Sequence, residues 1–200
     1  MPKKDWVGDG NSIFKQLGAS SHTDEEREEN DYYATDPRAI DDLFKMEEFS
    51  ENIWEPASGG GHLVNIMREK YHKNVFSSDL VDRGCQDELI DFISGFNQRE
   101  GDFDIITNPP FRYCTEFIIK SLELIKPHHK VAMFLKLQTL EGKDRYSKIY
   151  SIFPPKNVYV YVSRIQCGKN GEFTGTSAVC YAWFVWEKGY KGETVLKWIQ

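Results

Sequence analysis

The tetrapeptide Asn108-Pro109-Pro110-Phe111 directly follows the apolar run 104–107. Asn108 offers a side-chain carbonyl oxygen and Pro109 a backbone carbonyl, and each proline restricts its own φ angle and the residue before it, so both acceptors would be held in a stiff, extended segment. An amino group on a conjugated ring is a poor nucleophile, and such a pair could accept both of its N–H bonds. Phe111 adds a flat apolar face for stacking. The alternative is an ordinary turn, because short motifs recur by chance.

A second motif lies upstream, where a short apolar run over 52–56 is followed by a glycine cluster and then by apolar residues at helical spacing. This order predicts a strand, a tight turn and a helix, and the glycines Gly59 to Gly61 would let the backbone approach a ligand closely. The next apolar run, 74–79, ends at Asp79, where an open α/β sheet places an acid that accepts from ribose hydroxyls. The two motifs together predict a site for a ligand that contains a ribose.

A nicotinamide enzyme would use the same architecture, so the glycine turn has to separate the two possibilities. The dinucleotide fingerprint G-x-G-x-x-G requires a third glycine, whereas this chain continues after Gly61 with His62, Leu63 and Val64. Glu55 also places a negative charge where a pyrophosphate would lie. The turn therefore favours a ligand without phosphate and with a cationic group.

The order of these motifs resembles that of the N6-adenine family of class I S-adenosylmethionine-dependent methyltransferases, over roughly residues 32–190, and the compact form resembles phage and prophage members. The resemblance implies an α/β fold: a Rossmann-like, doubly wound, seven-stranded sheet, mostly parallel with an antiparallel C-terminal hairpin. It implies S-adenosyl-L-methionine as the cofactor, with segment 32–37 folded over its methionine end. The cofactor-binding residues that it implies are Tyr33, Thr35, Glu55, Pro56, Ala57, Gly59, Gly61, Asp79, Leu80, Asp91, Phe92 and Asn108.

The resemblance also implies direct, in-line methyl transfer to an exocyclic amino nitrogen, without a covalent enzyme intermediate. Its catalytic residues would be Asn108, Pro109, Pro110 and Phe111. Asn108 and the Pro109 carbonyl would polarise the amino group as it gains positive charge. The favoured substrate is N6 of adenine in DNA, flipped out of any duplex. An RNA adenine, a protein glutamine amide, or a non-catalytic module that keeps the fold are the alternatives.

The charge distribution supports an anionic substrate for the second half of the chain. The net charge is −6, but residues 1–110 hold 11 Lys and Arg against 24 Asp and Glu, a net −13, and residues 111–200 hold 14 against 7, a net +7. Phosphate contact is a reasonable use of such a basic half, and a solvated surface is the alternative for any single residue. The predicted substrate-binding residues are Phe111, Arg112, Lys143, Arg145, Arg164 and Lys169, and Lys136 and Lys148 are further basic residues after the tetrapeptide.

Periodicity predicts an acidic, largely disordered arm over residues 1–31 and a single domain over 32–200. Strand alternating with helix indicates a doubly wound sheet. Helices are expected near 37–49, 61–72, 112–125 and 143–151, and strands near 52–56, 74–79, 89–93, 103–107, 130–138, 157–163 and 178–187.

The short C-terminal half leaves no room for a separate target-recognition domain. The loops 138–143 and 164–176 should leave the same sheet edge as the tetrapeptide, and we expect them to contact the substrate, with plain connectors as the alternative. No long apolar run is present, which predicts a cytoplasmic protein without membrane contact. The four cysteines are widely spaced, so reduced thiols and no metal site are expected.

Overall fold

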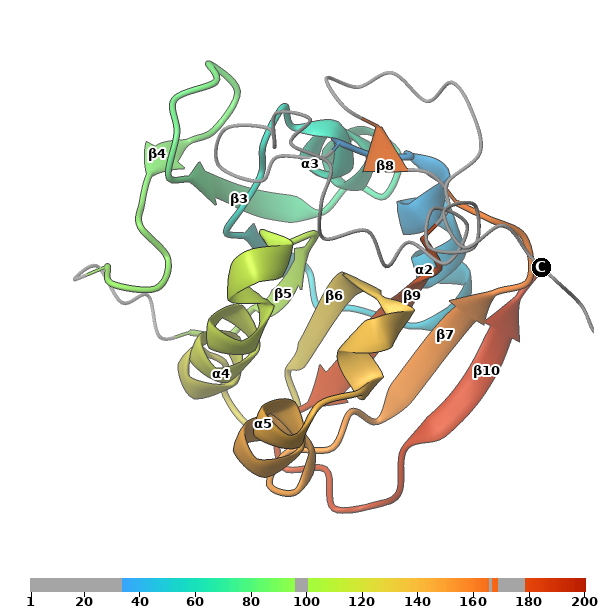
Figure 1. Cartoon of the computed structure of the whole chain (residues 1–200). Coiled ribbons are helices and arrows are strands. Elements are labelled where there is room, and N and C mark those ends of the chain that lie inside the picture. The colour runs from blue at the N-terminus through green and yellow to red at the C-terminus, as the bar shows by residue number, and fades with distance from the viewer. Residues whose placement is uncertain (1–33, 96–100, 166, 169–178) are drawn as a thin grey trace, which may run out of the picture.

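A mixed sheet of eight strands forms the centre of the computed structural model, in the order β10-β7-β9-β6-β5-β2-β3-β4 (Figure 1). The structure describes residues 34–95, 101–165, 167–168 and 179–200. The strands of this sheet are β2 (Asn52–Glu55), β3 (Asn74–Asp79), β4 (Glu88–Leu89), β5 (Asp104–Thr107), β6 (Lys130–Lys136), β7 (Asn157–Tyr161), β9 (Tyr181–Glu187) and β10 (Val195–Ile199).

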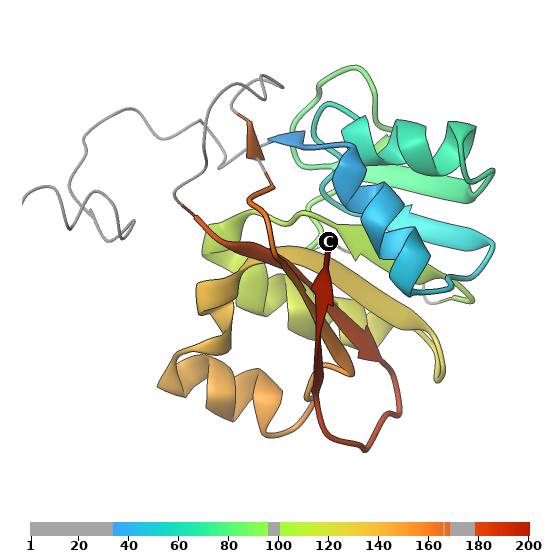
Figure 2. The same ribbon diagram turned by 90° about the vertical axis from the view of Figure 1, so that its right-hand side faces the viewer.

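Helices cover both faces of the sheet (Figure 2). Helices α2 and α3 pack on one face, and α4 and the helical segment after β6 pack on the other. Each helix contributes one apolar stripe, such as Ile40 and Leu43 of α2 or Phe117 and Ile118 of α4. The helices are α2 (Arg38–Met46), α3 (His62–Glu69), the 3₁₀ turn η2 (Phe111–Tyr113), α4 (Cys114–Leu124), the 3₁₀ turn η3 (Leu137–Leu140), α5 (Lys143–Arg145) and the π-helical turn η4 (Tyr146–Tyr150).

Strand β6 shows why its sequence is apolar without interruption. Ala132 and Phe134 belong to the core under α2 and α3, while Val131, Met133 and Leu135 belong to the core under α4. All five side chains are fully buried. A strand that is covered on both faces has no solvent side, so it does not alternate between apolar and polar residues.

The fold class expected from the sequence is confirmed. Strands β2, β3, β4, β5 and β6 run parallel, and β9 pairs antiparallel with both β6 and β7. An eighth strand, β10, adds parallel to β7 at the sheet edge, where no strand was expected. Its sequence, 195–199, has apolar residues on both sides of a single lysine and does not alternate with period two, and four of its five residues are exposed.

The strand expected near 89–93 is shorter than predicted. It ends at Leu89, because the Asp91 carboxylate accepts hydrogen bonds from the backbone N–H groups of Ile93 and Ser94 and closes a turn.

A second, two-stranded sheet joins segments that are distant in sequence. Strand β1 (Ala34–Thr35) pairs antiparallel with β8 (Cys167–Gly168).

Several predicted features lie outside the described residues: the arm 1–31, Tyr33, Lys169 and most of loop 164–176. Within the described part of the chain, none of the helices has the length and apolar character needed to cross a membrane.

Candidate active site

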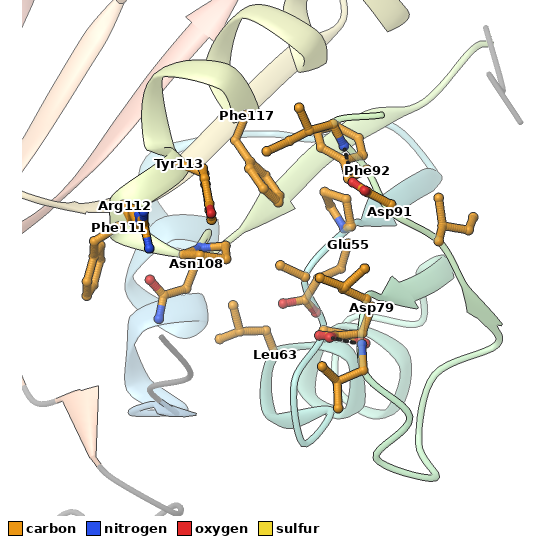
Figure 3. Close-up of a pocket in the computed structure, with 18 of the residues that line it drawn as sticks. Glu55, Leu63, Asp79, Asp91, Phe92, Asn108, Phe111, Arg112, Tyr113 and Phe117 are labelled. Carbon is orange, nitrogen blue, oxygen red and sulfur yellow. Dashed lines mark hydrogen bonds between the residues drawn. The ribbon is translucent and has the colours of Figure 1, made fainter. Parts of the chain in front are cut away.

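A cavity of about 910 Å³ opens at the carboxyl ends of the central parallel strands (Figure 3). Glu55 ends β2, Asp79 ends β3, Asn108 follows β5 and Lys136 ends β6, and all four line the cavity. Ligands of open α/β sheets bind in this crevice, and the volume suits a ligand of cofactor size. The local motifs found in the sequence therefore converge because parallel strands bring their carboxyl ends to one edge.

Most of the predicted site residues meet at this cavity. Gly59, Gly61 and Pro109 lie beside it without lining it, and Lys143, Arg145 and Arg164 lie outside it. The predicted residues that line it are Thr35, Glu55, Pro56, Ala57, Asp79, Leu80, Asp91, Phe92, Asn108, Pro110, Phe111 and Arg112. Further residues that were not named as binding or catalytic also line the cavity: Ala34, Ser58, His62, Leu63, Val81, Arg83, Ile90, Ile93, Ser94, Tyr113, Phe117 and Lys136.

The glycine turn lies beside the cavity and is hydrogen-bonded to Asp79, which lines it. Gly59 and Gly61 have φ angles of 54° and 75°, in the left-handed region that favours glycine. The Asp79 carboxylate accepts hydrogen bonds from the backbone N–H groups of Gly59 (2.7 Å) and Val81 (3.0 Å). Each carboxylate oxygen has more than one lone pair, so Asp79 can hold the turn and still accept from ribose hydroxyls.

Glu55 is a buried carboxyl group at the wall of the cavity. Its side chain is 2% exposed, and its Oε2 atom has no hydrogen-bond partner among the described residues. Burial raises the pKa of Glu55 well above its usual range, the negative charge of Asp79 raises it further, and Arg68 and the Val64 N–H oppose this shift only in part. A buried carboxylate without a cationic partner is costly. This oxygen therefore suits a ligand with an ammonium group.

Apolar and aromatic groups form the part of the cavity near Asp91. The Phe92 ring lies 4.8 Å from that of Phe117 and contacts Trp54 edge-on at 5.2 Å, measured between ring centres. The Ser94 hydroxyl, at 2.5 Å, lowers the pKa of Asp91. Asp91 thus holds its own turn, and it keeps one lone pair on Oδ2 for a ligand.

The amide of Asn108 is oriented by Thr35, a residue 73 positions earlier in the chain. Asn108 Nδ2 donates a hydrogen bond of 2.9 Å to the hydroxyl of Thr35, which is 3% exposed. Because Nδ2 bonds to Thr35, this arrangement defines which side of the amide carries Oδ1. Pro110 has φ −54° and ψ 119° and directly precedes the turn η2.

Phe111 lies on the far side of Asn108 from Glu55 and Asp79 (Figure 3). Its ring lies 5.7 Å from that of Tyr181. Tyr113, which is 43% exposed, also lines the cavity. Asn108 therefore lies between two parts of one cavity (Figure 3). The first compartment contains Glu55 and Asp79, and the second contains Phe111 and Arg112.

Arg145, predicted to bind substrate, supports a loop instead of lining the cavity. Its guanidinium donates to the backbone carbonyl oxygens of Thr139 (2.9 Å) and Glu141. The Tyr150 hydroxyl donates to the same Thr139 carbonyl at 2.7 Å. These bonds hold loop 138–142 in shape, and exposed Lys143 follows it at the start of α5.

Solved structures share this fold. The sequence itself matches no protein-family model and no curated protein. A structure from Listeria monocytogenes described as a class I S-adenosylmethionine-dependent methyltransferase is similar with a TM-score of 0.59 at 15% identity, over 94% of this chain and 71% of that one. The chain thus has the class I methyltransferase fold.

Two further similar structures carry nucleic-acid descriptions. One, described as an RNA methyltransferase from Pyrococcus horikoshii, has a TM-score of 0.58 at 14% identity, over 90% of this chain and 98% of that one. The other, the methyltransferase subunit of a type I restriction-modification system from Streptococcus thermophilus, has a TM-score of 0.59 at 12% identity, over 84% of this chain and 47% of that one. At these identities the similarity concerns the fold.

Proposed function

We propose that this protein is an S-adenosylmethionine-dependent methyltransferase that acts on an exocyclic amino group, with N6 of adenine in DNA as its substrate. The observation that carries the proposal is the position of Asn108 between two compartments of one cavity. Glu55 and Asp79 lie on one side of it, and Phe111 and Arg112 lie on the other. A transferase for two different ligands needs such an arrangement, because the reacting atoms must meet in one orientation.

The first compartment fits the cofactor group by group. The orphaned Glu55 oxygen matches the ammonium of the methionine part, and Asp79 matches the ribose hydroxyls. Ile90 and Phe92 supply apolar walls for a flat base. A dinucleotide fits less well, because its pyrophosphate would face the buried carboxyl of Glu55. When bound, S-adenosylmethionine supplies the electrophilic methyl group.

Asn108 and its neighbours would serve the amino group that receives the methyl. The Thr35 hydroxyl holds Nδ2 of Asn108, which gives the Oδ1 oxygen a defined direction. We propose that Oδ1 stabilises the positive charge that develops on the nitrogen, with the carbonyl of Pro109, beside the cavity, as the second acceptor. An Oδ1 acceptor that is already oriented needs no rearrangement during the reaction.

The second compartment supports a base of an anionic partner as the substrate, and we propose adenine in DNA. Phe111 provides an aromatic face, and Arg112 and Lys136 bring positive charge to the same end of the cavity. The net charge of +7 over residues 111–200 supports an anionic partner. The printed descriptions of two structural neighbours, one for an RNA methyltransferase and one for a restriction-modification methyltransferase subunit, agree with a nucleic-acid substrate.

A labelling experiment tests the proposal. The protein is incubated with S-adenosylmethionine labelled in its methyl group and, separately, with DNA, RNA and protein acceptors, and the products are digested and identified by mass spectrometry. We expect N6-methyladenine in DNA and none with Asn108→Ala. Label in RNA adenine or in glutamine would reassign the substrate. Absence of both label and calorimetric cofactor binding would refute the methyltransferase assignment and favour a non-catalytic module.

A further inference from the structure

Lys136 is a half-buried cation at the wall of the cavity. It ends β6, and its Nζ atom lies 4.7 Å from the centre of the Phe111 ring. Among the described residues, no carboxylate lies within ion-pair distance of Lys136. Its ammonium group thus lies at the second compartment and contacts the ring of Phe111.

Two other half-buried lysines, in or next to strands of the same sheet, have carboxylate partners. Lys130, at the opposite end of β6, forms a 2.6 Å ion pair with Glu47, and Lys156 forms a 2.7 Å ion pair with Glu187. Partial burial of an ammonium is costly, and a cation–π contact returns only part of that cost. An anion supplied by a ligand would provide the missing counter-charge for Lys136.

The charge of the lining side chains differs between the two compartments, which lie on either side of Asn108 (Figure 3). Carboxylates outnumber cations at the end that suits the cofactor, whereas the other end has two cations, Arg112 and Lys136. A substrate at that other end is favoured if it is an anion. The charged lining residues at the cofactor end are Glu55, Asp79, Asp91 and Arg83.

We propose that Lys136 binds a backbone phosphate next to the target nucleotide, so that the substrate of this site is a polynucleotide and not a protein glutamine. The inference rests on the proposed function, because it takes Asn108 as the reacting end of the cavity. The lysine ammonium has several N–H donors on a flexible stem, so it can reach a phosphate while a base lies against Phe111. Every target nucleotide within a polynucleotide is flanked by phosphates, whereas a glutamine amide is neutral and would give Lys136 a counter-charge only where an acidic side chain lies beside it.

The test pairs changes in the protein with changes in the substrate. The probe is a short synthetic duplex that contains the methylation site mapped by the labelling experiment, made with natural phosphates or with a neutral methylphosphonate on either side of the target adenine. The variants are Lys136→Gln, which removes the charge, and Lys136→Arg, which keeps it. Lys120→Gln is the matched control, because Lys120 is a half-buried lysine of α4 away from the cavity.

For Lys136→Gln we expect KM for the duplex to rise about tenfold, with kcat and the cofactor Kd retained. The slope of log binding constant against log salt concentration should fall by about one, as for the loss of one phosphate contact. Lys136→Arg should restore most of the affinity, and Lys120→Gln should behave as wild type. One methylphosphonate should cost wild type about the same factor and should cost Lys136→Gln little, because both changes remove the same contact.

Additive losses in the variant and the substrate, or an unchanged salt slope, would overturn the role of Lys136. If Lys136→Gln does not fold, the test uses wild type alone. An unchanged KM for both methylphosphonate duplexes would then contradict the proposal. Failure of the proposed function is recognised separately, because wild type would then label no nucleic acid at all.

Discussion

Replacing Glu55 with glutamine should stabilise the protein and weaken cofactor binding at the same time. Glu55 is buried with an orphaned Oε2 atom, and Asp79 adds a second negative charge nearby. Glutamine has nearly the same shape and no charge. The substitution therefore removes the cost of the buried carboxylate from the free protein and removes the partner of the ammonium from the complex.

The magnitudes follow from the burial of this group. Each unit by which burial raises the pKa of Glu55 costs the ionised wild type about 1.4 kcal/mol. Glutamine removes this ionisation cost but leaves an amide in the same unpartnered position, so for a protein of this size Tm should rise by roughly 2–4 °C for each kcal/mol relieved. Loss of a charge-assisted hydrogen bond to the ammonium, at about 1.5–3 kcal/mol, should raise the cofactor Kd by roughly 10- to 150-fold.

The effect on stability should depend on pH in a defined direction. Because the pKa of Glu55 is raised above 4.5 in the folded protein, the folded state binds more protons than the unfolded state once the pH exceeds that value. Stability of the wild type therefore falls as pH rises from 4.5 through the raised pKa, while Glu55→Gln lacks this loss. The difference in Tm between the two proteins should be small below pH 4.5 and should grow above it.

Thermal denaturation across pH and isothermal titration calorimetry measure both effects. Cofactor binding to wild type should release protons below the raised pKa, which is detected as a binding enthalpy that varies with the ionisation enthalpy of the buffer. Glu69→Gln, on the exposed side of α3, is the control and should change neither quantity. A Glu55→Gln protein with lower Tm, or with unchanged cofactor affinity, would refute this account of the site.

The remaining predictions concern three further cavity residues. Asn108→Ala should lower kcat by roughly 10²- to 10³-fold with little change in the cofactor Kd. A wild-type single-turnover rate at saturating cofactor would show that Asn108 serves only cofactor binding. Asp79→Ala should do the reverse, raising the cofactor Kd about tenfold or more in calorimetry while kcat at saturation is largely kept. Thr35→Val, which removes the acceptor for Asn108 Nδ2, should lower kcat by about two- to tenfold, and Thr35→Ser should restore it. Equal kcat for the Val and Ser variants would show that the hydroxyl does not position the amide.

Local sequence was sufficient to predict most of the elements around the site. The glycine turn and the tetrapeptide were identifiable because glycine and proline restrict or relax the backbone within a few residues. The strand that ends at Asp79 has the predicted bounds, and β2 and β6 differ from theirs by one or two residues. These strands are apolar runs with a turn at the end, so the signal lies within each segment.

Strand order and charge pairing, in contrast, were decided by residues far apart in the chain. Strand β10 was not expected, and its pairing with β7 at the sheet edge, not burial, determines its conformation, since four of its five residues are exposed. The hydrogen bond between Thr35 and Asn108 spans 73 residues. Arg145 carries the same charge as Lys136, and only the tertiary structure shows that one holds a loop and the other faces the cavity.

The sequence by itself determined that a glycine turn, an acid at the end of the next strand and an amide followed by two prolines occur in an order that resembles that of one methyltransferase family. The tertiary structure decided that they face one cavity, that the Glu55 oxygen there is buried without a partner, and that Lys136 lies beside Phe111. The physical reason is that backbone restriction acts between neighbours in sequence. Burial and electrostatic pairing depend on whichever residues the fold brings within a few ångströms.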